Sequence, residues 1–147
     1  MDTVVIYTDG SCIGNPGPGG WAAILECKGH KKEIVGNEKY STNNRMEITA
    51  VIKALEALTK PCKVIMHCDS AYVVDAHNKG WLTDWRENNW THGRKHEEVA
   101  NADLWIRLLK AEEQHEIEWC KVKGHAGIQE NEIVDKLANE AAQVAAK

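Results

Sequence analysis

Residues 6–22, IYTDGSCIGNPGPGGWA, decide the fold of this chain. An apolar run stops at Asp9, a connection dense in glycine and proline follows, and a second apolar run begins at Trp21. Two apolar runs joined by a short glycine-containing connection are typical of a hairpin. We therefore predict antiparallel strands over residues 3–8 and 21–27, with Asp9 where the first strand ends. The connection lacks the Gly-Lys-Ser/Thr ending of a phosphate-binding loop and leads into a strand, so we interpret it as a turn.

The rest of the chain predicts a mixed sheet with helices on its faces. A third strand is expected over residues 32–40, and helical spacing of apolar residues follows over 42–58, with Thr42 or Asn43 as N-cap and an end before Pro61. Strand 63–68 and helix 69–80 come next, and the order strand, helix, strand implies a right-handed crossover to a parallel partner. Residues 81–98 are polar, rich in tryptophan and predicted to be irregular, before helix 102–111, strand 116–124 and helix 129–145. We expect one α/β domain over residues 1–147.

Composition narrows the class of protein. The net charge of −4 argues against nucleic-acid binding through overall positive charge, so any such binding must be local. The five cysteines are odd in number and none shows the C-x-x-C spacing of a zinc or redox site. The start of the chain has no basic, apolar leader pattern, and no apolar run has membrane-spanning length. We expect a soluble cytoplasmic protein with reduced thiols.

Two aspartates share one local pattern. In both VVIYTDGS (residues 4–11) and VIMHCDSA (residues 64–71), an apolar strand is followed by Asp and then a small residue. If the two strands are parallel neighbours, Asp9 and Asp69 emerge together at the carboxyl edge of the sheet, where open α/β sheets bind ligands. The alternative is that each aspartate caps a turn or helix, and for Asp69 taken alone we favour that alternative.

Two further carboxylates lie on the sheet-facing sides of helices. Glu47 shares a helical line with Val51 and Leu58, so it points toward the sheet, where a carboxylate must be paired, protonated or bound to metal. The alternative for Glu47 is a simple interaction with the N-terminal helix dipole. Asp135 flanks the apolar stripe of the last helix, which alone is weak support.

Four converging carboxylates predict a divalent-metal site. They would repel one another unless their pKa values rise or a cation binds, and hard oxygen ligands suit Mg²⁺ or Mn²⁺ better than zinc. Two such ions about 3.5 to 4 Å apart form the site that cleaves phosphodiesters. The rival hypothesis is a carboxylate pair for glycoside hydrolysis, which would leave the other two acids unexplained.

These residues carry a family resemblance over nearly the whole chain. The blocks YTDGS (7–11), TNNRME (42–47), DS (69–70) and KGHAG (123–127), with Asp135 after them, occur in the order and spacing of a small, bacterial-type, single-domain ribonuclease H. The chain resembles that family, which implies a five-stranded mixed sheet with three antiparallel strands followed by parallel ones. It also implies that the protein is a Mg²⁺-dependent endonuclease, most simply a monomer, that hydrolyses the RNA strand of RNA/DNA hybrids.

The resemblance implies roles for the matched residues. Asp9 would bridge two Mg²⁺ ions, Glu47 and Asp69 would hold the ion on the leaving-group side, and Asp135 would hold the ion that carries the attacking water. Mn²⁺ would substitute for Mg²⁺, and the products would have 5′-phosphate and 3′-hydroxyl ends. His125 would assist proton movement or product release, although a lone loop histidine is usually only solvated.

The resemblance also assigns substrate contacts. Reading a hybrid requires contacts to 2′-hydroxyls across a wide minor groove. The residues implied in this work are Cys12, Asn15, Thr42, Asn43 and Asn44, and the tryptophan-rich segment with Trp81 and Trp85 would lie against the DNA strand. Turn and cap chemistry is the alternative for Asn15 and Asn43, and core packing is at least equally favoured for Trp85.

Two departures from the family pattern bear on affinity. Ala71 stands where the family often has a long polar residue, and residues 77–97 carry a charge of only +1 before His77, His92 and His96 are counted. We therefore expect weak, salt-sensitive binding that tightens at low pH. The alternatives are a DNA-directed nuclease of the same fold and a non-catalytic hybrid-binding module. Because Asn43, Asn44 and Cys12 suit 2′-hydroxyl recognition and all four acids are present, we favour the hybrid nuclease.

Overall fold

A five-stranded mixed sheet forms the centre of the protein. The structure is a computed structural model that describes residues 1–121 and 129–147. The strands follow the order β3-β2-β1-β4-β7. Both β1–β2 and β2–β3 pair antiparallel, and both β1–β4 and β4–β7 pair parallel, which confirms the predicted topology. The bounds are β1 (Asp2–Cys12), β2 (Gly17–Cys27), β3 (His30–Ser41), β4 (Cys62–Cys68) and β7 (Glu116–Lys121).

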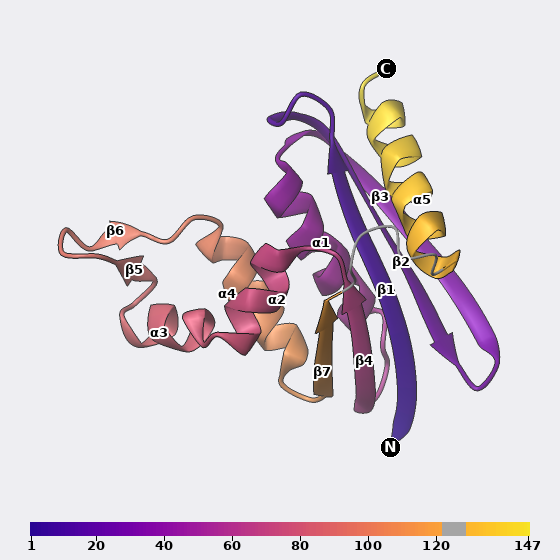
Figure 1. Ribbon diagram of the computed structural model, residues 1–147, viewed down its shortest axis with the longest axis horizontal. Helices are drawn as coiled ribbons and strands as arrows, with labels where there is room; N and C mark the ends of the chain where they lie inside the picture. The colour runs from indigo at the N-terminus through magenta and orange to yellow at the C-terminus, as the bar shows by residue number, and fades with distance from the viewer. Residues whose placement is uncertain (122–128) are drawn as a thin grey trace.

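Helices cover both faces of the sheet. On one face, α1 packs against β1 and β2, α2 packs against β4 and β7, and α4 packs on α1, around a large apolar core that includes Ile6, Val64 and Trp105. On the other face, α5 packs over β1 and β2 around Ile24, Val134 and Ala138 (Figure 1). The helix bounds are α1 (Asn43–Glu56), α2 (Ala71–Asn78), α3 (Trp81–Glu87), α4 (Ala102–Glu112) and α5 (Gln129–Ala145). Within the described residues, none of these helices has the length and apolar character needed to cross a membrane.

Side-chain caps fix where the central helices begin. The Thr42 hydroxyl accepts a hydrogen bond from the Arg45 N–H at 3.2 Å, so α1 begins one residue after the predicted cap. Ser70 caps α2 in the same way through the N–H of Val73. The caps Thr42 and Ser70 lie one residue after β3 and two residues after β4. Because β3 and β4 run in the same direction, α1 and α2 both begin at the same edge of the sheet.

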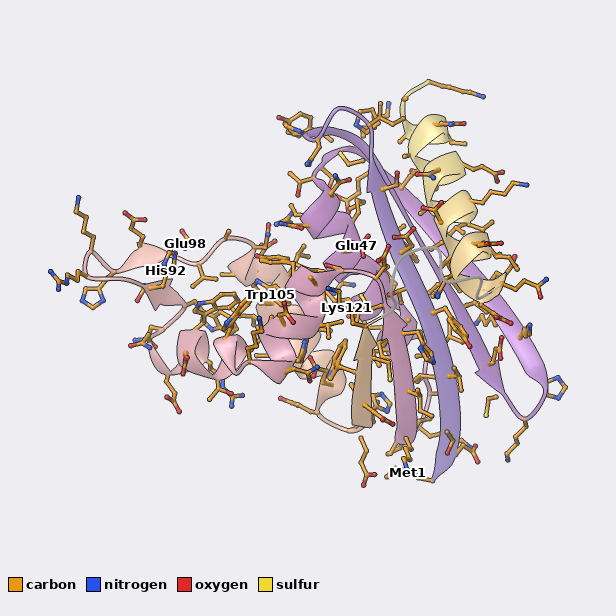
Figure 2. All side chains as sticks on the ribbon, viewed as in Figure 1. Met1, Glu47, His92, Glu98, Trp105 and Lys121 are labelled. Carbon is orange, nitrogen blue, oxygen red and sulfur yellow. The ribbon has the colours of Figure 1, made fainter. Side chains whose placement is uncertain are left out.

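Residues 81–98 form a projecting arm instead of the irregular segment we predicted. The arm consists of α3 and of a hairpin between β5 (Thr91–His92) and β6 (Glu97–Glu98). His92 and Glu98 lie on the part that extends from the body, and Trp105 lies near its root (Figure 2). The prediction failed because a seven-residue helix and two-residue strands are too short to show hydrophobic periodicity.

The first strand is longer than predicted. It continues past Asp9 to Cys12 because β2 remains beside it, with Asp9 opposite Ala22 and Cys12 opposite Gly19. Its parallel pairing with β4 ends at Thr8, opposite Cys68. Asp9 therefore does not end the strand, but it does mark the point where β1 loses its parallel neighbour.

Candidate active site

The parallel register places the two aspartates at the same level. Thr8 and Cys68 are the last paired residues of β1 and β4, so Asp9 and Asp69 are each the next residue at the same edge of the sheet. Asp69 is exposed, and Asp9 is 7% exposed. The predicted juxtaposition of the two strand ends is therefore present, with one carboxylate buried and the other open to solvent.

Glu47 reaches this edge from the second turn of α1. The N–H of Gly10 lies 2.9 Å from Oε1 of Glu47 and 2.9 Å from Oδ1 of Asp9, so one amide donor serves both carboxylates. A Cβ atom on Gly10 would collide with the backbone of Met46 and Glu47. Glycine at this position therefore lets α1 approach β1 closely enough for the two acids to meet. Gly10 was not predicted to be part of the site, although it directly follows Asp9 in the sequence.

The last helix brings the fourth carboxylate to Asp9. Asp135 lies on α5, beside the buried residues Val134 and Ala138, as its position next to the apolar stripe predicted. It is near enough to Asp9 to raise the pKa of that carboxyl group. The charge of Asp69, in turn, raises the pKa of Glu47. Asp9 and Glu47 therefore meet at the Gly10 N–H, and Asp135 and Asp69 each influence one of them.

The crowding raises the pKa of the two most buried acids. Burial is the main cause that raises the pKa of Asp9 to about 7; the nearby Asp135 also raises this pKa, and hydrogen bonds with Glu47 and Gly10 lower it. Burial and the charge of Asp9 raise the pKa of Glu47 well above its usual range. Burial and mutual repulsion therefore disfavour the ionised forms of both carboxyl groups.

The chemistry of this cluster fits a divalent cation. Oε2 of Glu47 is buried and has no hydrogen-bond partner among residues 1–121 and 129–147, which is costly for a carboxylate oxygen unless a cation or proton meets it. Burial raises the pKa of the Cys68 thiol, which directly precedes Asp69, to about 12, so the thiol stays neutral. The carboxylate oxygens are therefore the available metal ligands. Within residues 1–121 and 129–147, no group of three His, Cys, Asp or Glu side chains is already arranged as a metal cage.

Polar residues predicted to contact substrate surround the carboxylates. Oδ1 of Asn15 accepts a hydrogen bond of 3.0 Å from the N–H of Asn43, which joins the β1–β2 turn to the start of α1. The thiol of Cys12 donates to the carbonyl groups of Gly17 and Ser41 at 3.4 and 3.3 Å. Turn and cap roles for Asn15 and Thr42 are thus present, while the side chains of Asn43 and Asn44 remain exposed.

Aromatic side chains pack the arm against the body of the protein. Trp85 lies between Trp81 and Trp105, with ring centroids 6.1 and 5.9 Å away, and all of them join the large core. The core packing that was the alternative for Trp85 is therefore present, and Trp81 lies at the end of this series away from the buried Trp105.

His77 stacks on Trp119 and hydrogen-bonds to Val73 and Glu112 with only 9% of its side chain exposed. It cannot serve as a surface charge for substrate, which corrects our count of three available histidines to His92 and His96.

One predicted catalytic residue has no structural test here. His125 and the KGHAG block lie outside the described residues. Sequence analysis also missed two polar contacts that hold α5, from Ser11 to Asn139 and from Lys31 to Glu130, because neither pair forms a motif.

Comparison with known proteins identifies the family. A model of the RNase H family matches residues 1–143. The ribonuclease H of Thermoanaerobacter sp. strain X514 is 54% identical over 140 residues, which cover 95% of this chain and 90% of that protein. The crystal structure of LC9-RNase H1, a type 1 RNase H with the type 2 active-site motif, superposes with a TM-score of 0.87 at 32% identity, covering 99% of this chain and 74% of that one.

A second solved structure shares the fold at lower identity. LC11-RNase H1, solved in complex with an RNA/DNA hybrid, has a TM-score of 0.73 at 22% identity, covering 98% of this chain and 99% of that one. The family match and the 54% identical relative agree with the motif order and with the sheet topology. The chain therefore belongs to the ribonuclease H family.

Proposed function

We propose that this protein is an endoribonuclease that hydrolyses the RNA strand of RNA/DNA hybrids. The observation that carries the proposal is the meeting of Asp9 and Glu47 at the Gly10 N–H, where one oxygen of Glu47 is buried without a partner in the part of the chain that the structure describes. Asp135 and Asp69 influence this pair through their charges. Membership of the ribonuclease H family supports the same reaction class. An RNA/DNA hybrid is also the ligand in the LC11-RNase H1 complex.

The four carboxylates would hold two Mg²⁺ ions, with Mn²⁺ as a substitute. When bound, the ions supply an activated water and stabilise the leaving oxygen of the phosphodiester, which leaves 5′-phosphate and 3′-hydroxyl ends. Asp9 would contact both ions, Glu47 and Asp69 the ion on the leaving-group side, and Asp135 the ion on the water side. Oε2 of Glu47 would gain in this way the partner that the described part of the chain does not provide.

Groups of the chain itself orient the carboxylates, limit the access of water and would transfer protons. The Gly10 N–H holds the carboxylates of Asp9 and Glu47 in a fixed mutual orientation. The partial exclusion of water strengthens every electrostatic interaction at this edge. His125 would move a proton or assist product release. The catalytic set of the proposal is thus Asp9, Glu47, Asp69, Asp135 and His125.

Substrate recognition would combine a polar groove and the arm. The residues proposed to read the minor groove are Cys12, Asn15, Thr42, Asn43 and Asn44, which cluster where the β1–β2 turn meets the start of α1. Short polar side chains and backbone amides suit contacts to 2′-hydroxyls. Trp81 would contact the DNA strand, while Trp85 would mainly hold the arm in place.

A cleavage assay with three duplexes tests the proposal. Labelled RNA/DNA, RNA/RNA and DNA/DNA duplexes are offered with Mg²⁺ and with chelator, to the wild type and to Asp9→Asn. We expect cleavage of the RNA strand of the hybrid only, loss with chelator, and a loss of at least about a thousandfold in Asp9→Asn. Asp75→Asn, which alters an acidic residue paired with Lys79 away from the site, is the matched control and should retain activity. Cleavage of the DNA duplex, or full activity of Asp9→Asn, would contradict the proposal.

We further infer that residues 1–147 act as one domain, as a monomer in the cytoplasm. The reduced state of all five described cysteines agrees with a reducing compartment. Light scattering at the concentration of the activity assay should give the mass of one chain, and a dimer mass would contradict the inference.

A further inference from the structure

Three pairs of residues align β1 with α5. Tyr7, Asp9 and Ser11 alternate along β1 and therefore share the face that α5 covers. The Ser11 hydroxyl donates a hydrogen bond to Oδ1 of Asn139. In the same order along both elements, the charge of Glu130 raises the pKa of Tyr7 and the nearby Asp135 raises the pKa of Asp9.

The spacing of the pairs is set by element geometry. Two residues of a strand advance about 6.6 Å, and four residues of a helix advance about 6 Å. The step from Asp9 to Ser11 on β1 therefore matches the step from Asp135 to Asn139 on α5. Residues four apart also lie on one helix face, so Asn139 and Asp135 point to the same side. A bond at Asn139 consequently fixes both the height and the rotation of Asp135.

The apolar contact below α5 differs along the helix. Near its start, Val134 joins a small core with Ile24, and Tyr7, Ile133 and Leu137 pack against that core. Further along, the helix packs through the small residues Ala138, Ala141 and Ala142, and it lies so close to β2 that a Cβ atom on Gly20 would collide with the helix backbone. Small side chains interlock less than large ones, so a polar contact in this second part adds a restraint on register that the packing there does not supply.

The second polar contact joins long charged side chains at the surface. Nζ of Lys31 lies 3.0 Å from Glu130 and 3.3 Å from Glu26, and the Lys31 side chain is 56% exposed. An exposed ion pair of this kind contributes little and weakens with salt. The Ser11–Asn139 hydrogen bond is exposed as well, but it joins short uncharged side chains and starts two positions after Asp9, so it acts closer to the carboxylates.

We propose that Ser11 and Asn139 are positioning residues that hold α5 at the register in which Asp135 meets Asp9. Neither side chain needs to contact substrate or metal for this role. The inference rests on the proposed function, because it requires Asp135 to work together with the carboxylates of β1 and α1.

The test is a double-mutant cycle with two kinds of measurement. Ser11→Ala, Asn139→Ala and the double variant are compared with the wild type, with Ser11→Thr as the variant that keeps the hydroxyl. Gln143→Ala, one turn further along α5 at an exposed position, is the matched control. Steady-state cleavage of the hybrid gives kcat and KM, and calorimetric titration with Mg²⁺ without substrate reports the metal site directly.

We expect each alanine variant to lose about tenfold in kcat and in Mg²⁺ affinity, with KM for the hybrid nearly unchanged. The double variant should lose about tenfold rather than a hundredfold, because both changes remove one contact. Ser11→Thr should retain most activity, and Gln143→Ala all of it. Since alanine is the better helix former, Asn139→Ala should keep its thermal midpoint, which separates misplacement from unfolding.

Two results would contradict the positioning role of Ser11 and Asn139 without contradicting the proposed function. One is that Ser11→Ala and Asn139→Ala behave like Gln143→Ala while Asp135→Asn is inactive. The other is that the two single losses multiply in the double variant. Full activity of Asp135→Asn would instead overturn the proposed function, and the positioning role with it.

Discussion

Arg45 on α1 binds both carboxylate oxygens of Asp103 on α4, at 3.0 and 2.9 Å, and its Nη1 also donates to Asn101 at 3.3 Å. Arg45 lies two residues before Glu47, and Asp103 lies at the root of the arm. The fork of the guanidinium therefore connects the carboxylate site to the arm through two parallel hydrogen bonds.

We predict that Arg45→Lys loosens this connection. Lysine cannot make the paired contact, so the free energy of unfolding should fall by about 1 kcal/mol and KM for the hybrid should rise several-fold more than kcat falls. Arg107→Lys is the matched control, because Arg107 makes the same kind of two-bond contact with Glu56 between the same helices but far from the site. It should show a similar loss of stability with KM unchanged. Equal KM effects in both variants would argue against a connection to substrate binding.

The raised pKa of Asp9 predicts that the metal-free protein loses stability as pH rises. The pKa is about 7 in the folded protein and near 3.9 in the unfolded chain, so the folded state binds the extra proton between these values. Stability is therefore highest below about pH 4 for this group and falls as pH rises to 7. We expect a loss on the order of 2 to 3 kcal/mol between pH 5 and pH 8, measured by denaturant unfolding in chelator.

Asp9→Asn is the reference for that measurement, because it removes the group while keeping its size. Acids with lowered pKa values, such as Asp2 and Glu56, act mainly below this window, and they are common to both proteins. His115, whose pKa is lowered by burial, contributes in the opposite direction and also cancels in the comparison. The variant should therefore show a clearly shallower loss from pH 5 to pH 8. Parallel curves for the two proteins would show that Asp9 is ionised without metal.

Mg²⁺ should stabilise the folded protein, and more so at high pH. A cation that binds only the folded state adds about 2.7 kcal/mol at 100 times its Kd. It should also remove the penalty of burying ionised Asp9 and Glu47, so the rise in thermal midpoint should be larger at pH 8 than at pH 5. Glu47→Gln should lose most of this rise, whereas Asp75→Asn should keep it. A rise of equal size in Glu47→Gln would place the binding elsewhere.

The few basic residues of the arm predict salt-sensitive binding of the hybrid to which each single charge contributes. Lys95 lies in the turn between β5 and β6, after Arg94 and two residues before Glu97. Lys95→Ala should lower the slope of log affinity against log salt by up to about 1 and weaken binding of all hybrid sequences alike. Lys32→Ala, on β3 far from the arm, should leave the slope unchanged.

Elements with strong local patterns were predictable from the sequence. Helix α1 and its Thr42 cap follow from hydrophobic spacing and cap chemistry, and α5 matches the predicted residues 129–145. The direction of Glu47 follows from the same spacing, since three- and four-residue steps place it on the sheet side. The antiparallel order of β1, β2 and β3 followed from the short connections, and one parallel pairing followed from the crossover. The complete five-stranded arrangement was implied by the family resemblance.

Features that depend on distant partners were not predictable. The extension of β1 beyond Asp9 depends on β2 remaining beside it, and no local pattern distinguishes Gly10 as the donor to two carboxylates. The burial of His77 against Trp119 is set by how α2 packs on β7, although its sequence neighbours suggested a surface position. The prediction for the arm failed for a different reason, because its helix and strands are too short to show hydrophobic periodicity.

The placement of α5 on its own face of the sheet has a consequence for the order of events during translation. The three acids Asp9, Glu47 and Asp69 leave the ribosome early, together with the strands and helices that form the larger core. Asp135 follows more than sixty residues after Asp69, and its helix docks on the opposite face through a separate small core. A nascent chain could therefore hold a nearly complete sheet while its nuclease stays inactive, and activity would begin only when α5 has docked.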